Sequence, residues 1–179
     1  MGFFIVFVVL LILILIFSSK TLSPIPYFPS QPVDIPLIIK ALKLRNGQTV
    51  FDLGAGDGIV IFEAAKEAYR KKLNTTFVAV EINPVLILVL HLRRLFHPNR
   101  KNIKIVMGDM FKIYLMNFIN FKNFITIYLY ISPWFLEKTI YNIKKQFETF
   151  RVVSYMYSIK SLKKKEKIIR GKNRIFTYN

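Results

Sequence analysis

The chain has 179 residues, which is enough for one domain with a sizeable hydrophobic core. It contains no cysteine, so disulfide bonds are excluded, and this agrees with a cytoplasmic domain. The 27 basic and 10 acidic residues give a formal net charge of +17. Such a charge indicates nucleic acid, an anionic membrane surface or an acidic substrate as a partner, unless it only reflects a chain rich in lysine throughout.

The N-terminal segment is strongly apolar, with fifteen apolar residues in an unbroken run at 3–17. As a helix, residues 1–19 would measure about 28 Å, close to the ~30 Å hydrocarbon core of a bilayer. We therefore expect residues 1–19 to form a transmembrane anchor. No Lys or Arg precedes Lys20, so the positive-inside rule predicts a single-pass protein of the cell membrane with its N-terminus outside and its domain in the cytoplasm. A cleaved signal peptide and a buried core helix are the alternatives.

Residues 20–35 form a proline-rich segment between the anchor and the domain. Five of the eight prolines lie between positions 24 and 36, which predicts an extended and rather stiff chain. Tyr27 and Phe28 in its middle favour a segment that packs on the domain over a free spacer. Residues 36–179 are then expected to form the folded domain.

Strands and helices alternate through this domain. Strands are expected at 48–54, 75–82, 102–109, 123–131 and 151–159. Helices are expected at 36–45, 58–71 and 84–96. A fourth helix is expected to begin with Ser132 as N-cap and Pro133 as first helical residue and to end at about residue 150. Residues 110–120 are expected to be irregular or helical. This alternation with near-continuous apolar strands predicts an α/β fold, a parallel sheet covered by helices on both faces.

The tail is expected to form a β-hairpin, with short strands at 166–170 and 174–178 around the turn 171–173. It also contains the densest basic cluster, because residues 160–174 include eight Lys or Arg. Aromatic residues that stack on bases are missing there, which disfavours nucleic acid. Next to a bilayer, contact with anionic lipid headgroups is the simplest explanation.

A glycine-rich turn follows the first strand of the domain. Three of the chain's seven glycines, Gly54, Gly56 and Gly58, fall within five positions there. Such a turn brings backbone close to a ligand. It contains no Lys or Arg but is accompanied by two carboxylates, Asp52 and Asp57, which argues against a phosphate ligand.

Four of the ten carboxylates gather at one predicted edge of the sheet: Asp52, Asp57, Glu81 and Asp109. The first two belong to the first strand and its turn, and the others end the second and third strands. Helix capping by Asp57 or Asp109 is the alternative, but it explains neither Glu81 nor the common edge. Because ligands bind beyond the carboxyl ends of parallel strands, we expect a ligand that is cationic or rich in hydroxyl groups and amines.

The glycine spacing excludes the common nucleotide-binding patterns. The dinucleotide fingerprint G-x-G-x-x-G requires glycine at position 59, which is Ile59, and no Walker sequence follows the turn. A nucleoside without pyrophosphate therefore fits better. S-adenosylmethionine (SAM) meets every requirement, because it has a sulfonium, an amino group, a ribose and an adenine.

Three segments resemble the motifs of class I SAM-dependent methyltransferases. "VFDLGAGDG" at 50–58 is similar to their motif I, "AVEIN" at 79–83 to the acidic motif that follows, and "VMGD" at 106–109 to the third. The resemblance implies a Rossmann-like fold with SAM as cofactor. It implies that Asp52 and Gly54 face the methionine part and that Gly56 allows close backbone approach.

The same resemblance assigns Glu81 to the ribose and Asp109 to the adenine end, with Asp57 as a further cofactor-binding residue. The lead-in "IPYFPSQP" at 25–32 resembles small methyltransferases with a Pro-Tyr-x-Pro segment, several of which have one N-terminal membrane segment. Their eukaryotic members include lysine methyltransferases of the ATP synthase c-subunit and of the adenine nucleotide translocase. This likeness covers residues 25–159. It departs at Ile59, where many relatives have arginine, and at Ser30, where they often have threonine.

The narrower resemblance also suggests acceptor-side residues. Tyr27 and Pro29 would close over the cofactor or line the substrate channel. Tyr27 and Tyr130 are the candidate catalytic residues, with core packing as the alternative role of Tyr130. An aromatic channel would favour a neutral lysine amine, and Trp134 is a further candidate for it, with Ser132 beside it. "SPWF" at 132–135 also faintly resembles the motif of methyltransferases that modify amino groups of bases or glutamine.

No metal site is expected, because His91 and His97 have no cysteine or carboxylate companions. The sequence thus predicts a membrane-anchored, SAM-dependent methyltransferase whose acceptor is a protein lysine, with a membrane protein as a candidate substrate. One alternative is an RNA or small-molecule methyltransferase that uses the basic surface. Another is a non-catalytic SAM-binding module that acts as a membrane tether.

Overall fold

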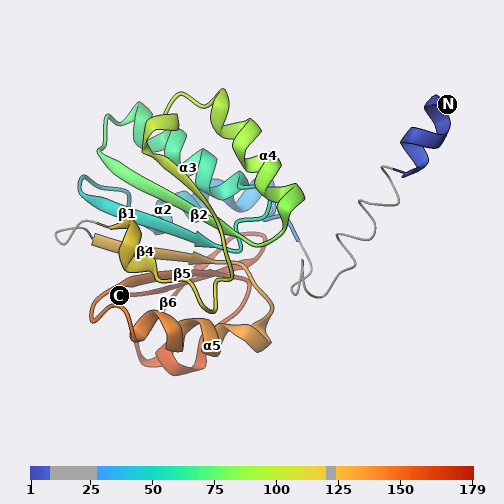
Figure 1. The fold of residues 1–179 in the computed structure, drawn as a ribbon. Coiled ribbons are helices and arrows are strands. Elements are labelled where there is room, and N and C mark those ends of the chain that lie inside the picture. The colour runs from blue at the N-terminus through green and yellow to red at the C-terminus, as the bar shows by residue number, and fades with distance from the viewer. Residues whose placement is uncertain (9–27, 120–123) are drawn as a thin grey trace.

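The computed structural model describes residues 1–8, 28–119 and 124–179. Its centre is a seven-stranded sheet in the order β3-β2-β1-β4-β5-β7-β6, with helices on both faces (Figure 1). The first five strands are parallel, and β7 runs antiparallel to both β5 and β6. The predicted α/β fold is confirmed, including the Rossmann-like parallel sheet.

The strands are β1 (Gln48–Leu53), β2 (Thr75–Glu81), β3 (Ile103–Met107), β4 (Phe124–Leu129), β5 (Arg151–Tyr155), β6 (Glu166–Arg170) and β7 (Arg174–Tyr178). The α-helices are α2 (Ile35–Leu42), α3 (Ile59–Arg70), α4 (Pro84–Leu95) and α5 (Pro133–Lys144). Short 3-10 helices occur at Pro32–Asp34, Arg100–Asn102, Leu115–Phe118 and Lys160–Lys165. The predicted hairpin strands have the bounds that the sequence indicated.

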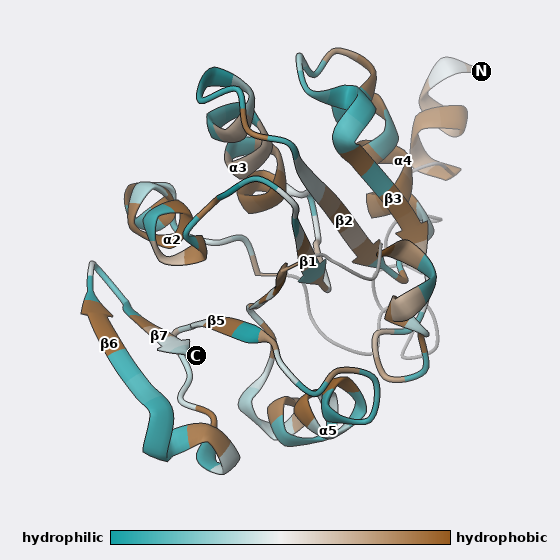
Figure 2. Ribbon diagram, turned by 90° about the vertical axis from the view of Figure 1, so that its left-hand side faces the viewer, coloured by the Kyte–Doolittle hydropathy of each residue, from teal (hydrophilic) through white to brown (hydrophobic). Residues whose placement is uncertain are grey.

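Alternate residues of each central strand serve two separate cores. Val50 packs with α2, α3 and α4 on one face of the sheet, whereas Phe51 packs with α5 on the other. Figure 2 shows the same arrangement, with α2, α3 and α4 on one side of the sheet and α5 on the other. All six residues of β1 are buried, and its apolar residues Val50, Phe51 and Leu53 pack into both cores, as expected of a strand that is covered on both faces.

The sequence predicts a helix from Ser132 to about residue 150, but α5 already ends at Lys144. Gln146 reaches across to the chain before Leu115: its Oε1 accepts a hydrogen bond from Leu115 N at 2.6 Å, and its Nε2 donates to Ile113 O at 3.1 Å. These tertiary contacts are invisible in the local sequence. Ser132 does occupy the N-cap position before Pro133, but its side chain makes no capping hydrogen bond.

The segment before α2 is fastened to the C-terminal hairpin through Asp34. This fully buried carboxylate accepts hydrogen bonds from Tyr155 Oη (2.7 Å), Lys172 N (2.7 Å) and Asn173 N (2.9 Å). Burial raises the pKa of the Asp34 carboxyl, but these hydrogen bonds outweigh burial and hold the pKa below its ordinary value. We call this arrangement the Asp34 clasp. A side chain at Gly171 would overlap Asp34 Oδ1, so the turn needs glycine there.

Residues 2–8 are helical, and the first seven residues are exposed. Residues 9–27, which hold most of the expected anchor and the start of the proline-rich segment, lie outside the described residues. Within the described ranges, no helix is both long enough and apolar enough to cross a membrane. The structure thus describes only residues 1–8 of the expected anchor, and the membrane span stays a prediction.

Candidate functional site

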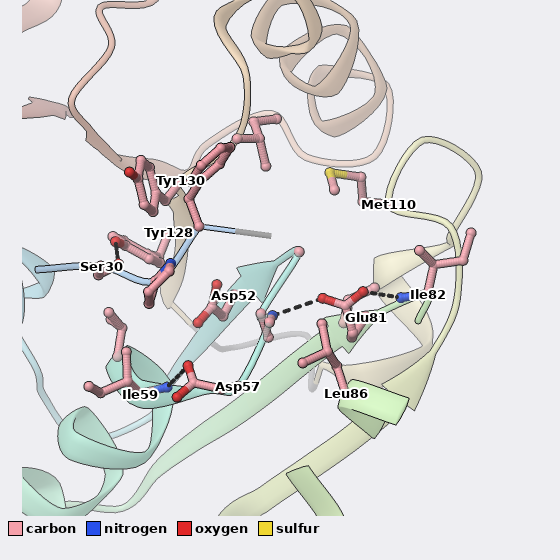
Figure 3. Close-up of a pocket in the computed structure, with 18 of the residues that line it drawn as sticks. Ser30, Asp52, Asp57, Ile59, Glu81, Ile82, Leu86, Met110, Tyr128 and Tyr130 are labelled. Atoms are coloured by element: carbon pink, nitrogen blue, oxygen red, sulfur yellow. Dashed lines mark hydrogen bonds between the residues drawn. The ribbon is translucent and has the colours of Figure 1, made fainter. Parts of the chain in front are cut away.

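The principal pocket lies at the carboxyl ends of the parallel strands, where strand order reverses between β1 and β4. Its wall combines the loops after β1, β2 and β3, the end of β4 and the segment that precedes α2. The residues that line it are Phe28, Pro29, Ser30, Asp52, Gly54, Ala55, Gly56, Asp57, Ile59, Val60, Val80, Glu81, Ile82, Leu86, Gly108, Asp109, Met110, Phe111, Tyr128, Tyr130 and Ile131. Figure 3 shows the labelled side chains around this cavity.

The glycine-rich loop after β1 adopts a backbone that few side chains tolerate. Gly54, Gly56 and Gly58 all have positive φ, at 81°, 59° and 77°. A side chain at Gly58 would also overlap Leu90, so α3 and α4 pack closely only because this residue is glycine. The loop thus exposes its backbone to the pocket.

Glu81 holds this loop in place. Its Oε2 accepts a hydrogen bond from Gly56 N at 2.8 Å, while Oε1 accepts from Ile82 N and Asn83 N at 2.8 and 2.9 Å (Figure 3). The carboxylate at the end of β2 therefore ties the β1 loop to the start of α4. It also lines the pocket, where the sequence resemblance assigns it to the ribose.

Asp52 is the unusual carboxylate of the site. It is 3% exposed, points into the pocket, and receives no hydrogen bond from the described residues. Burial, reinforced by the charges of Glu81 and Asp57, raises its pKa well above the ordinary value. A buried carboxyl without donors in a protein of this basicity is suited to a cationic ligand that enters the pocket.

Asp57 and Asp109 have partners of their own. Asp57 Oδ2 pairs with Arg93 Nη1 at 2.7 Å, and its Oδ1 accepts a hydrogen bond from Ile59 N at 3.2 Å. Asp109 Oδ1 accepts from Phe111 N at 2.8 Å. Both carboxylates stabilise their own loops and also line the pocket, but neither is a helix N-cap, because the N-cap of α3 is Gly58 and no helix directly follows Asp109.

An aromatic wall faces these carboxylates. The hydroxyls of Ser30 and Tyr128 are hydrogen-bonded at 2.8 Å, which joins the segment before α2 to β4. Burial raises the pKa of both Tyr128 and Tyr130, so these phenols stay protonated at neutral pH. Tyr130 meets Tyr155 edge to face, with ring centroids 4.9 Å apart. The Asp34 clasp therefore supports the pocket wall through Tyr155.

The predicted site residues separate into three groups. The structure gathers Asp52, Gly54, Gly56, Asp57, Glu81, Asp109, Pro29 and Tyr130 around the pocket. Ser132 and Trp134 are not among the described residues that line it, and Trp134 is 81% exposed. Tyr27 lies outside the described residues.

Sequence reasoning did not assign Ser30, Tyr128, Met110 or Phe111 to the site. One signal was available: Tyr128 and Tyr130 are two positions apart on a strand, so their side chains share a face. Met110 and Phe111 have no such pattern, because they belong to an irregular loop. Among the residues that the structure describes, no three His, Cys, Asp or Glu side chains form a group that could hold a metal ion.

Comparison with known proteins shows what the chain is similar to in sequence and in fold. No protein-family model matches the chain. It is 28% identical over 89 residues to a lysine N-methyltransferase of the ATP synthase c-subunit from Xenopus laevis, a stretch that spans 50% of this chain and 36% of that relative.

Solved structures share the fold over most of the chain. An RNA methyltransferase of Salinibacter ruber, crystallised with S-adenosyl-L-homocysteine, superposes with a TM-score of 0.68 at 17% identity, covering 84% of this chain and 92% of the other. A precorrin-6y C5,15-methyltransferase of Geobacter metallireducens gives 0.58 at 15% identity, with 86% and 95% covered. The chain has the fold of the SAM-dependent methyltransferases.

Proposed function

We propose that this protein is a SAM-dependent methyltransferase whose acceptor is a lysine amine of another protein. One observation carries the assignment of SAM as the cofactor. Asp52, which is buried and accepts no hydrogen bond from the described residues, lies at the same strand ends as a glycine loop with positive φ. SAM offers an ammonium and a sulfonium to such a carboxylate. The methyltransferase fold and the sequence similarity to a methyltransferase support the same reading.

Different residues of the pocket fit different parts of SAM. Asp52 and the backbone of Gly54 would hold the methionine end, Glu81 the ribose hydroxyls and Asp109 the adenine end. When bound, SAM supplies an activated methyl group for in-line transfer, in which the carbon–sulfur bond breaks as the carbon–nitrogen bond forms. The protein's task is to align the acceptor and to exclude water.

The acceptor would enter along the aromatic wall. A lysine amine must lose a proton to attack, and an apolar aromatic channel favours the neutral amine. Tyr130 and Phe111 line this side, and Pro29 belongs to the segment that covers it. A lysine acceptor is supported by the similarity to the lysine N-methyltransferase of Xenopus laevis.

Membrane attachment is part of the proposal. The apolar run at 3–17 has the composition of a bilayer span, and the described residues 2–8 are helical with exposed apolar side chains. Attachment at residues 1–19, followed by the linker at 20–35, would hold the domain at 36–179 beside membrane proteins. The acceptor is then a protein of the same membrane.

An RNA acceptor is the second candidate. The net charge of +17 and the fold shared with an RNA methyltransferase of Salinibacter ruber favour it. Against it, "SPWF" lacks the second proline of the base-modifying motif, and Trp134 is not among the described pocket residues.

The first test is calorimetric titration of SAM and NAD into the full chain. We expect micromolar SAM binding, no NAD binding, and affinity for SAM about 30-fold weaker in Asp52→Asn, because a charged hydrogen bond is lost. Glu63→Gln, at an exposed carboxylate of α3, is the matched control and should bind normally. A folded protein that does not bind SAM would rule out the enzyme.

The second test identifies the acceptor. The protein is incubated with membranes and SAM that has a labelled methyl group, and the labelled material is hydrolysed. Methyl-lysine in the hydrolysate supports the proposal. Label that ribonuclease releases supports the RNA alternative, and SAM binding without any transfer supports the non-catalytic tether.

A further inference from the structure

Helix α4 is apolar on the face that it turns away from the protein. Leu88, Leu92, Leu95 and Phe96 are 60%, 54%, 55% and 84% exposed, and their spacing places them on one side of the helix. We call these four residues the α4 face. On the opposite side of the helix Leu86 and Leu90 are buried, as in an ordinary amphipathic helix, so the α4 face is a second apolar surface without a partner among the described residues.

The surroundings of the α4 face are basic. No Asp or Glu occurs anywhere in residues 82–108, whereas the same stretch contains five Arg or Lys residues. Arg93 and Arg94 turn inward, to Asp57 and to the carbonyl of Ile103. The other three, Arg100, Lys101 and Lys104, are exposed. Two carboxylates from other segments lie near α4: Asp57 is paired with Arg93, and Glu63 lies near His97. An apolar helix face with three exposed cations and no Asp or Glu in its own stretch is complementary to an anionic lipid surface.

The connection to the N-terminal segment places this face near the expected bilayer. Phe28 and Leu86 line the same pocket at the carboxyl ends of the strands, so the described domain begins at the end of the sheet where α4 starts. Residues 18–27 link that point to the apolar run at 3–17 and reach at most about 35 Å when extended. If residues 3–17 lie in a membrane, the α4 face is within reach of its surface.

We propose that the α4 face docks into the headgroup region of an anionic bilayer. The edge of the sheet formed by α4 and β3 is then the membrane side of the domain. The basic cluster at 160–174, which includes the opposite edge strand β6, is largely hydrophilic (Figure 2). In α4, by contrast, eight of the twelve residues are Leu, Ile or Val. Charge alone holds a protein near a lipid surface, whereas the α4 face also adds apolar area to bury, with four exposed apolar side chains on one side of the helix.

The chain without cysteine makes a direct test possible. Single-cysteine variants of the full chain, Leu92→Cys, Tyr141→Cys and Ile168→Cys, receive a fluorophore and are incorporated into vesicles of phosphatidylcholine and phosphatidylglycerol that contain nitroxide-labelled lipid. Tyr141 on α5 and Ile168 on β6 are exposed to a similar degree as Leu92, so they are matched controls. We expect quenching by the nitroxide at position 92 to be at least about twofold stronger than at 141 or 168.

Each other outcome overturns the proposal. Stronger quenching at 168 assigns the membrane side to the basic tail, and a label at 92 that stays unquenched means that residues 3–17 act as a tether only or that another protein surface covers the α4 face. Adding Leu88→Glu to Leu92→Cys should reduce quenching to the control level while the thermal unfolding transition, followed by circular dichroism, is retained, which shows that the domain is still folded. The measurement needs no cofactor, so it remains valid if the proposed methyl transfer is wrong.

Discussion

Two aspartates of this protein are buried almost equally but lie in opposite surroundings. Asp34, at the hairpin end of the sheet, is fully buried and accepts hydrogen bonds from one tyrosine and two backbone amides. Asp52, at the pocket end, is 3% exposed and receives none from the described residues. The pKa of Asp34 is lowered by its hydrogen bonds against the effect of burial, and that of Asp52 is raised by burial and by neighbouring carboxylates.

The difference shows how to separate architecture from function in a single sheet. A buried carboxylate whose donors all come from the chain contributes to stability and has little left for a ligand. A buried carboxylate without donors destabilises the empty protein and is compensated only when a cation binds. Of the two, only Asp52 is expected to affect cofactor binding strongly. Removal of the Asp34 carboxylate is expected to destabilise the fold, whereas removal of the Asp52 charge is expected to stabilise the protein without ligand.

The largest effect is expected from removal of the Asp34 carboxylate. Asp34→Ala should lower the free energy of unfolding by about 3 kcal/mol, because the Tyr155 hydroxyl and the amides of Lys172 and Asn173 lose the acceptor of their hydrogen bonds. Urea denaturation measures this. Glu67→Ala, which removes a surface ion pair, should change stability by under about 0.5 kcal/mol. A loss below about 1 kcal/mol in Asp34→Ala would contradict the clasp.

The next effect tests the same clasp from the hairpin side. Gly171→Ala should cost about 2 kcal/mol, because the new methyl group overlaps Asp34 Oδ1 and also approaches Leu37 Cδ1 to 3.0 Å. Gly108→Ala is the matched control, since its methyl group would lie 3.4 Å from Ile113, an ordinary contact. Equal stability of the two variants in thermal unfolding would show that the hairpin turn is free to move away from Asp34.

Asp52→Asn should have the opposite sign. Without SAM at pH 7 this variant should be more stable than the wild type by about 1 kcal/mol, because the buried charge is gone. The pKa of Asp52 in the folded protein lies above the unfolded value of about 3.9. Folding therefore favours the protonated carboxyl, and this contribution to stability is lost as pH rises through the folded pKa. The advantage of Asp52→Asn should therefore vanish near pH 4. For Asp34 the sign reverses, and stability should fall as pH drops below about 4.

The smallest effect concerns the paired carboxylate of the pocket. Arg93→Ala should weaken SAM binding about threefold, because Asp57 loses the partner that holds the glycine loop. Since the ion pair is partly exposed, stability should change by under about 1 kcal/mol. Calorimetry with Lys71→Ala as a control on another surface ion pair measures the difference. A loss as large as that of Asp52→Asn would mean that Asp57 and Asp52 act as one unit.

The sequence was sufficient for the sheet and for one side of the pocket. Strands such as β2 have apolar residues on both faces, and the glycine turn and the acids at the strand ends have fixed local patterns, so Asp52, Glu81 and Asp109 were found. The other side depends on contacts across long separations. Ser30 meets Tyr128 98 positions away, and the Gln146 contacts that accompany the end of α5 come from a loop 31 positions earlier. No local pattern encodes such partners.

The Asp34 clasp also has a consequence for the order in which the protein is made. Asp34 leaves the ribosome 138 residues before Lys172, its hydrogen-bond donor in the hairpin. Until that hairpin is synthesised, the segment that contains Pro29 and Ser30 has no fastening at this end, and the wall of the pocket lacks the support that Tyr155 gives to Tyr130. The nascent chain is therefore expected to complete this pocket only late in translation, after the last two strands have paired.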